Sequence, residues 1–190
     1  MVEELAEEYE GQNVLFLEQD VDEPLGGRFD RWMLGYRGSD TIYLPLVMVD
    51  SGNRVSNGSE DFHAVYSFMV DTALVRPVTA NMVVESERVG DDLHLAVRLT
   101  NWSGTTLGPA NSATLTALVY EESTTTAVPV IAAAGTTPIT TLADGATGEF
   151  TFEVGVGSAD WDLIRWVVIA DYQPVGADYP FDTLQAAMGP

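Results

Sequence analysis

The sequence contains no cysteine and no lysine, and each absence excludes a class of function. Without cysteine the chain can form no disulfide, carry out no dithiol exchange and offer no thiolate to a metal ion. All eight basic residues are arginine, against 29 acidic residues, so the net charge is -21. A charge this negative opposes binding to nucleic acid and to anionic membrane surfaces. It is compatible both with adaptation to salt and with a GC-rich genome.

Other signals are also missing. No apolar run reaches the ~20 residues that a membrane-spanning helix needs. The only histidines, His63 and His94, lie far apart in the sequence, and neither stands at metal-ligand spacing. The adjacent acids Asp91-Asp92 and Glu121-Glu122 fall at predicted strand ends, where solvated turn residues are the rule. The sequence therefore predicts no catalytic residue, no cofactor and no metal site.

What is present begins with a predicted βαβ unit over residues 13–50. The apolar run 14–17 is typical of a strand that is covered on both faces. A helix should follow from about Pro24, and a second buried strand, 46–49, is entered through Pro45. The spacing of apolar residues also predicts helices over 2–10 and 60–75, the second capped by Ser59, with a short return strand from Val55 between them.

From residue 80 onward the pattern changes from helical periodicity to alternation. Leu93, Leu95, Val97 and Leu99 point one way and His94 the other, so His94 is expected on an exposed sheet face. Seven short strands separated by turns predict a β-sandwich. The expected strands are 82–87, 93–101, 113–120, 128–132, 148–156, 164–172 and 183–187. We expect an α/β domain over 1–77 followed by an all-β domain over 78–190.

The first part contains, in this order, Glu4 to Gln12, Val14 to Asp22, Leu44-Pro45 and Asp50 to Val55. Together these segments resemble the second half of a thioredoxin. The resemblance implies a partial thioredoxin-like domain in which Pro45 is a cis-proline, beside the place where that family carries a Cys-x-x-Cys pair. The pair and the strand before it are not in this chain. An open sheet edge would invite association, so we expect either a homodimer or further residues upstream of Met1.

The end of the chain contains residues 159–171, Tyr179 and the Gln-Ala ending of 183–187. These residues resemble the end of a group of bacterial outer-membrane lipoproteins that pair a thioredoxin-like with an immunoglobulin-like domain. This resemblance implies an immunoglobulin-like sandwich in an exported, extracellular or envelope-associated protein.

Together these features predict a non-catalytic binding or scaffolding protein with a redox-dead thioredoxin-like domain, not an enzyme. Its partner would be a protein or a second copy of the chain. The alternative is a fragment of an envelope thiol-disulfide oxidoreductase whose Cys-x-x-Cys lies upstream of Met1. A third hypothesis is an unidentified ligand bound between the domains. Trp102, Trp161 and Trp166 could form a stacking surface for sugar or peptide, but the sandwich core or rim is their expected place.

Overall fold

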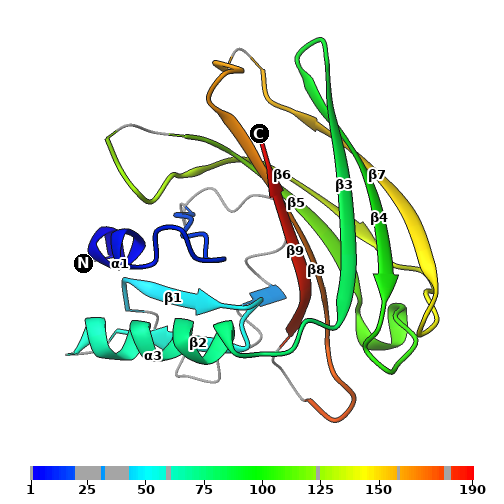
Figure 1. Cartoon of the computed structure of the whole chain (residues 1–190), viewed down its shortest axis with the longest axis horizontal. Helices are drawn as coiled ribbons and strands as arrows, with labels where there is room; N and C mark the ends of the chain where they lie inside the picture. Colours follow the sequence, from blue (N-terminus) through cyan, green and yellow to red (C-terminus); the bar gives the residue numbers. More distant parts are fainter. Residues whose placement is uncertain are drawn as a thin grey trace.

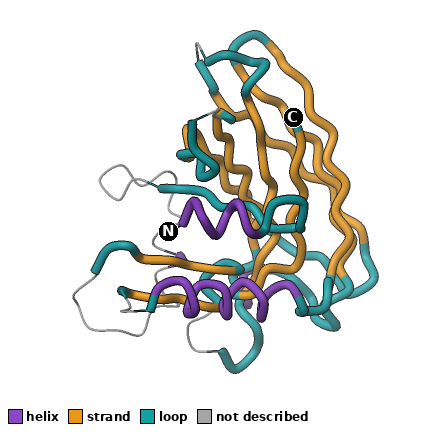
Figure 2. The backbone as a smooth tube through the Cα atoms, turned by 60° about the vertical axis from the view of Figure 1, so that its left-hand side comes forward, coloured by secondary structure: helices purple, strands orange, loops and turns teal. Residues whose placement is uncertain are grey.

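The computed structural model describes residues 2–19, 31–32, 43–58, 61–122, 125–157, 159–177 and 181–190. A β-sandwich forms one side of the molecule, and a smaller N-terminal part with two described helices and a hairpin lies against it (Figures 1 and 2). No described helix is long and apolar enough to cross a membrane.

The sandwich consists of two antiparallel sheets. The first has the order β3-β4-β7, formed by β3 (Ala80–Val89), β4 (Asp92–Asn101) and β7 (Thr147–Gly155). The second has the order β6-β5-β8-β9, and its strands are β5 (Thr114–Glu121), β6 (Ile131–Pro138), β8 (Ile164–Tyr172) and β9 (Asp182–Gly189). A short 3-10 helix, η1 (Pro109–Asn111), precedes β5.

The alternation of apolar and polar or small residues explains why one face of the first sheet is buried and the other is exposed. The odd-numbered apolar residues of β4, from Leu93 to Leu99, are all buried in the core between the sheets, while Ala96 and Arg98 face outward. In contrast, β5 and β8 are buried along almost their whole length, because both faces of their sheet are covered. The inner face meets the first sheet, and the outer face meets the N-terminal part.

The N-terminal part has its own small core. The helix α1 (Val2–Glu8) and the helix α3 (Phe62–Leu74) pack against the hairpin of β1 (Leu46–Val49) and β2 (Arg54–Asn57). Residues from both helices and the α1 C-terminal turn fill this core: Leu5, Tyr9, Tyr66, Met69 and Val70. The side chain of Asp61 accepts a hydrogen bond from the amide of Ala64 and caps α3. Ser59, the expected cap, lies outside the described residues.

The expected strand at residues 14–17 is wrong. This segment has no strand assignment, and in the part of the chain that the structure describes β1 pairs only with β2. Its side chains do alternate, but between two cores. Val14 and Phe16 pack into the N-terminal core, while Leu15 and Leu17 pack on the outer face of the second sheet.

The main chain directly after this segment is held by the sandwich and not by β1. Glu18 forms a parallel bridge with Val130, in which its amide donates to Pro129 and its carbonyl accepts from Ile131, at 3.0 and 2.9 Å. The predicted βαβ unit is therefore not formed by strands at 14–17 and 46–49. Instead, Glu18 ties the chain to the segment that precedes β6.

The seven strands of the sandwich are confirmed, with one large shift. The expected strand 128–132 is found as β6 at Ile131–Pro138. The predicted helix beginning near Pro24 falls on residues outside the description, apart from Arg31 and Trp32, which are helical. The peptide bond between Leu44 and Pro45 is cis, the isomer that the resemblance implies. Helix α3 ends at Leu74 and β3 begins at Ala80, on either side of the expected domain boundary.

Candidate functional site

A buried ion pair ties the N-terminal part to the sandwich. Asp171 on β8 is fully buried, and its Oδ1 accepts from Nε and Nη2 of Arg31 at 3.1 and 2.6 Å. The Oγ1 hydroxyl of Thr114 donates to the same oxygen at 3.0 Å. The Arg31 guanidinium also lies 3.7 Å from the ring centroid of Phe181. Because each charged group has several partners, we assign this cluster a structural role.

A second cluster joins the β1–β2 turn to the start of β9. Arg76 bridges Asp50 and Asp182, with both nitrogen–oxygen distances at 3.0 Å. Asn53 Nδ2 donates to Asp182 at 2.5 Å, and the hydroxyls of Ser51 and Thr183 lie 2.8 Å apart. Burial raises the pKa of Asp50, and the neighbouring Arg76 opposes that rise. This cluster, too, positions the two parts relative to one another.

The residues singled out in the sequence do not come together. Pro45 stands at the entrance of β1, next to Tyr43 and Leu44, which are both more than half exposed. His63 is on α3, half exposed, with its Nε2 3.0 Å from Glu8 Oε1. His94 is on the outer face of β4 in the sandwich. No catalytic arrangement links these three positions.

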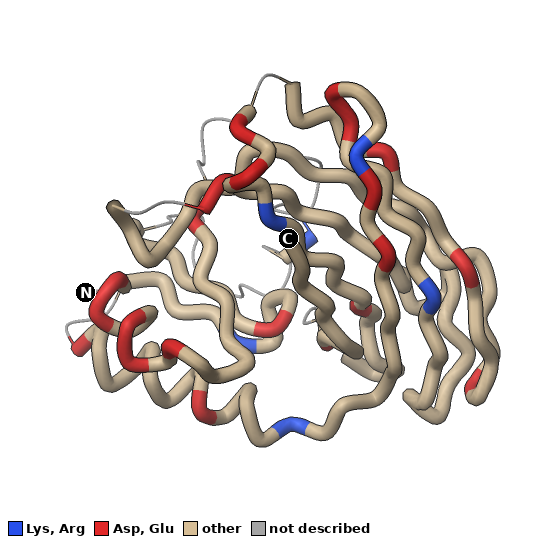
Figure 3. Tube along the Cα trace, turned by 45° about the horizontal axis from the view of Figure 1, so that its top comes forward, with Lys and Arg blue, Asp and Glu red and all other residues tan. Residues whose placement is uncertain are grey.

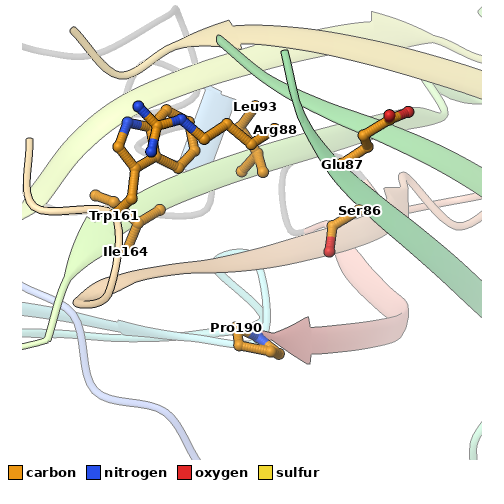
Figure 4. Close-up of a pocket in the computed structure, with 7 residues that line it drawn as sticks. All are labelled: Ser86, Glu87, Arg88, Leu93, Trp161, Ile164 and Pro190. Atoms are coloured by element: carbon orange, nitrogen blue, oxygen red, sulfur yellow. The ribbon is translucent and has the colours of Figure 1, made fainter. Parts of the chain in front are cut away.

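The three tryptophans do not share one surface. Trp166 is buried, and its indole N–H donates to the Pro190 carbonyl at 2.8 Å. Trp161 lines a shallow pocket of about 220 Å³ at the open end of the sandwich, near Leu93. The Arg88 guanidinium covers its ring, 4.3 Å from the centroid (Figure 4). Trp102 follows the opposite end of β4 and is 56% exposed. These positions do not support a stacking surface that includes all three rings.

The outer face of the first sheet carries the better candidate site. A groove of about 470 Å³ crosses β3, β4 and β7. The small side chain of Ala96 lies in the groove, and acidic residues lie along it. Its lining residues are Glu85, Ser86, Glu87, His94, Leu95, Ala96, Thr151 and Phe152. Beside it, Asp92, His94 and Glu153 place one possible ligand atom each within 4.8 Å of the others.

Sequence reasoning missed this cluster. It read Asp92 as a solvated turn residue and His94 as an exposed sheet residue, and both are partly exposed. The available signal was their spacing of two, which places both side chains on one face of a strand. Glu153 could not be found in this way, because only the pairing of β4 with β7 brings it opposite His94.

No protein-family model and no curated protein matches the chain. Among solved structures, a β-glucuronidase from glycoside hydrolase family 2 is similar over 61% of this chain, with 10% identity and a TM-score of 0.37. Spo0M, a sporulation control protein from Bacillus subtilis, is similar over 58%, with 10% identity and a TM-score of 0.35. A penta-heme cytochrome c552 from Thermochromatium tepidum is similar over 92% of this chain and 53% of its own, with 11% identity and a TM-score of 0.35.

This chain spans 11% of the glucuronidase and 47% of Spo0M. The three TM-scores lie well below the level at which a shared fold carries an argument.

Proposed function

We propose that the chain is a non-catalytic binding or scaffolding module built on an immunoglobulin-like sandwich. The strand order supports this assignment, because β3-β4-β7 and β5-β8-β9 follow the connectivity of the two sheets in that fold. The remaining strand, β6, lies beside β5. In constant-type immunoglobulin domains the fourth strand lies in the opposite sheet, so the proposal concerns the architecture and not that subtype.

The N-terminal part agrees with a partial thioredoxin-like unit in the order of its elements and differs from it at residues 14–17. The order of α1, the β1–β2 hairpin and α3, with both helices in one core with the hairpin, agrees with the resemblance. Residues 14–17 depart from it, because they do not pair with β1. Since the sequence contains no cysteine, this unit cannot perform dithiol exchange. Its proposed role is to brace the sandwich.

The binding function is proposed because the outer face of only one of the two sheets is covered by the N-terminal part. The N-terminal part covers the outer face of the second sheet, where Leu118, Ile131 and Val167 are buried. The outer face of the first sheet instead presents the groove over Ala96 to solvent. A groove on three hydrogen-bonded strands is a preformed surface, so a ligand would lose little free energy in ordering it.

The charge of this face indicates its partner. Glu85, Glu87 and Glu153 lie on the outer face, which Arg98 shares. Acidic residues are spread over the whole molecule, and basic ones are few (Figure 3). We therefore propose a protein partner that contributes a basic segment. The same charge opposes self-association at low salt, so a homodimer would form only where salt screens the repulsion.

Thermal-shift screening of the full chain tests the function. Basic, neutral and acidic peptides and a panel of oligosaccharides are compared at equal concentration. We expect a stabilising shift with basic peptides. Ala96→Arg, in the groove, should abolish the shift, whereas Val175→Arg, at a position 89% exposed in the β8–β9 connection, should keep it. The absence of a shift with every class, or an equal loss in both variants, would refute a binding face here.

An extracellular or envelope location is part of the same proposal and rests on the lipoprotein resemblance. The rival function, a thiol-disulfide oxidoreductase, rests on the thioredoxin resemblance. Reading the genomic DNA in frame upstream of Met1 for an export signal and a Cys-x-x-Cys separates the two. A Cys-x-x-Cys there would favour the rival, and an export signal without it would favour the binding module.

A further inference from the structure

Three side chains on the outer face of the first sheet form a compact group of metal-ligand types. Asp92 and His94 come from β4 and Glu153 from β7. A carboxylate oxygen of each acid and a ring nitrogen of His94 all lie within 4.8 Å of one another. Imidazole nitrogen and carboxylate oxygen are ligands that Zn²⁺ accepts together, usually at about 2.0–2.2 Å.

The sheet itself creates this arrangement. His94 and Glu153 are directly paired in the β4–β7 ladder, so their side chains stand side by side on the same face. Asp92 is two residues before His94 and therefore shares that face. Its own partner is Gly155, where a Cβ would lie 3.5 Å from the Asp92 Oδ1 atom. The missing side chain leaves room for the Asp92 carboxylate above β7.

The three side chains are available for a ligand. Among the described residues, no hydrogen bond or ion pair engages the side chains of Asp92, His94 or Glu153. They therefore differ from His63, which already contacts Glu8, and from Asp171, which is held by Arg31. Two carboxylates this close repel each other, and a divalent cation between them would remove that repulsion.

We propose that Asp92, His94 and Glu153 bind a zinc-type divalent cation. The imidazole favours Zn²⁺ over Ca²⁺ and Mg²⁺, which prefer oxygen ligands throughout. Three protein ligands leave a fourth tetrahedral position for water or for a group from a partner. The site goes beyond the proposed binding function. It shares His94 with the groove, but a cation needs no peptide in order to bind there.

Calorimetric titration of the full, chelator-treated chain with Zn²⁺ tests the proposal. We expect one ion to bind per chain, and Ca²⁺ and Mg²⁺ to bind more weakly under the same conditions. His94→Ala and Glu153→Gln should each weaken Zn²⁺ binding by about tenfold or more. Both positions are at least partly exposed on a sheet face, so the fold should survive, which circular dichroism would verify.

Matched controls separate a defined site from general acidity. Glu149→Gln makes the same charge change on the same face of β7, opposite Arg98, and should leave the affinity unchanged. His63→Ala removes the other histidine and should also have no effect. Equal weakening by Glu149→Gln and Glu153→Gln would overturn the proposal, as would undiminished binding in His94→Ala or no binding by the unmodified chain. Because no peptide or sugar is present, this result is independent of the screen for the groove.

Discussion

Two tyrosines in the N-terminal core differ in what their hydroxyl groups contact. The Tyr9 hydroxyl donates to Asp71 Oδ1 at 2.7 Å. The Tyr66 side chain is almost completely buried, and its hydroxyl has no hydrogen-bond partner in the described structure. A buried polar group without a partner loses its interaction with water and gains nothing in return. The two residues should therefore respond in opposite ways to the same substitution.

We expect Tyr66→Phe to leave the stability unchanged or to raise it. The substitution keeps the ring that packs near Phe62 and removes only the unpaired hydroxyl. The expected change in the free energy of unfolding is between zero and about +1 kcal/mol. Urea denaturation measures it. As the matched comparison, Tyr9→Phe should lower the free energy of unfolding by about 1.5 kcal/mol or more, because it removes a hydrogen bond to a charged carboxylate. A larger loss for Tyr66→Phe than for Tyr9→Phe would contradict this account.

The same tyrosine gives a pH prediction. Burial, followed by the hydrogen bond to Asp71, raises the pKa of Tyr9 from 10.0 to about 12. The neutral hydroxyl is therefore favoured in the folded state, and its contribution to stability is fully present below pH 10. It is lost as the pH rises from 10 through 12, because the unfolded chain ionises first.

We expect the difference in unfolding free energy between the unmodified chain and Tyr9→Phe to be constant from pH 7 to 9 and to shrink above pH 10. Denaturation at several pH values measures it, and the comparison with the variant removes the ionisation of the other tyrosines. A difference that grows above pH 10 would have the wrong sign.

At the scale of elements, strands whose pattern was strongly alternating were predicted well. β4 was found within one residue because its four inward leucine and valine side chains alternate with polar or small ones. β6 was misplaced because Ala132 to Thr137 has small side chains with no alternation, so pairing with β5 sets its bounds. The predicted cap of α3 fell on Ser59, whereas Asp61 is the residue that bonds its first turn.

The segment 14–17 shows why an apolar run alone does not define a strand. It was correctly expected to be covered on both faces, since its side chains enter two cores. What the sequence could not show is where the main chain forms its hydrogen bonds. The residue directly after the segment, Glu18, bonds to Pro129 and Ile131, more than a hundred positions away in the sequence.

The turn between β1 and β2 gives a prediction for an element. Gly52 has a φ of +85°, and a Cβ there would lie 2.8 Å from the Trp32 carbonyl oxygen. We expect Gly52→Ala to lower the free energy of unfolding by about 2–3 kcal/mol, because backbone strain and overlap with main-chain atoms add. Gly90→Ala is the matched control, since Gly90 also has a positive φ, +66°, but nothing within 4 Å. Gly90→Ala should cost only about 1 kcal/mol, the strain of an L side chain in the left-handed region. Thermal or urea denaturation compares the two, and equal losses would show that the close approach to Trp32 has no effect.

At the scale of the whole molecule, two of the few arginines form ion pairs between the N-terminal part and the sandwich. The chain has eight arginines against 29 acids, and Arg31 and Arg76 both stand at the junction. Neither cluster could be predicted from the sequence, because Arg31 and Asp171 are 140 residues apart. The proposed cation site was out of reach for the same reason, since it depends on the pairing of β4 with β7. The composition indicated an acidic surface, but it could not show which acidic side chains lie close together in the folded chain.

The buried pair gives the prediction for the whole molecule. Arg31→Ala would leave the fully buried Asp171 carboxylate without its arginine, although Thr114 still donates to it. Breaking such a pair from one side costs about 3 kcal/mol, because the remaining charge stays in a poorly solvating environment. The loss should appear first as detachment of the N-terminal part, since Arg31 is the partner on that side.

Hydrogen exchange followed along the chain distinguishes detachment from global unfolding. In Arg31→Ala we expect faster exchange in α1, β1 and α3, while β4 and β7 keep their protection. Arg165→Ala is the control: its partner Glu122 is 55% exposed, so this variant should lose at most about 1 kcal/mol and show no change in the N-terminal part. If Arg31→Ala accelerated exchange equally in β4 and β7, the two parts would unfold as one unit, and loss of the ion pair would not be what separates them.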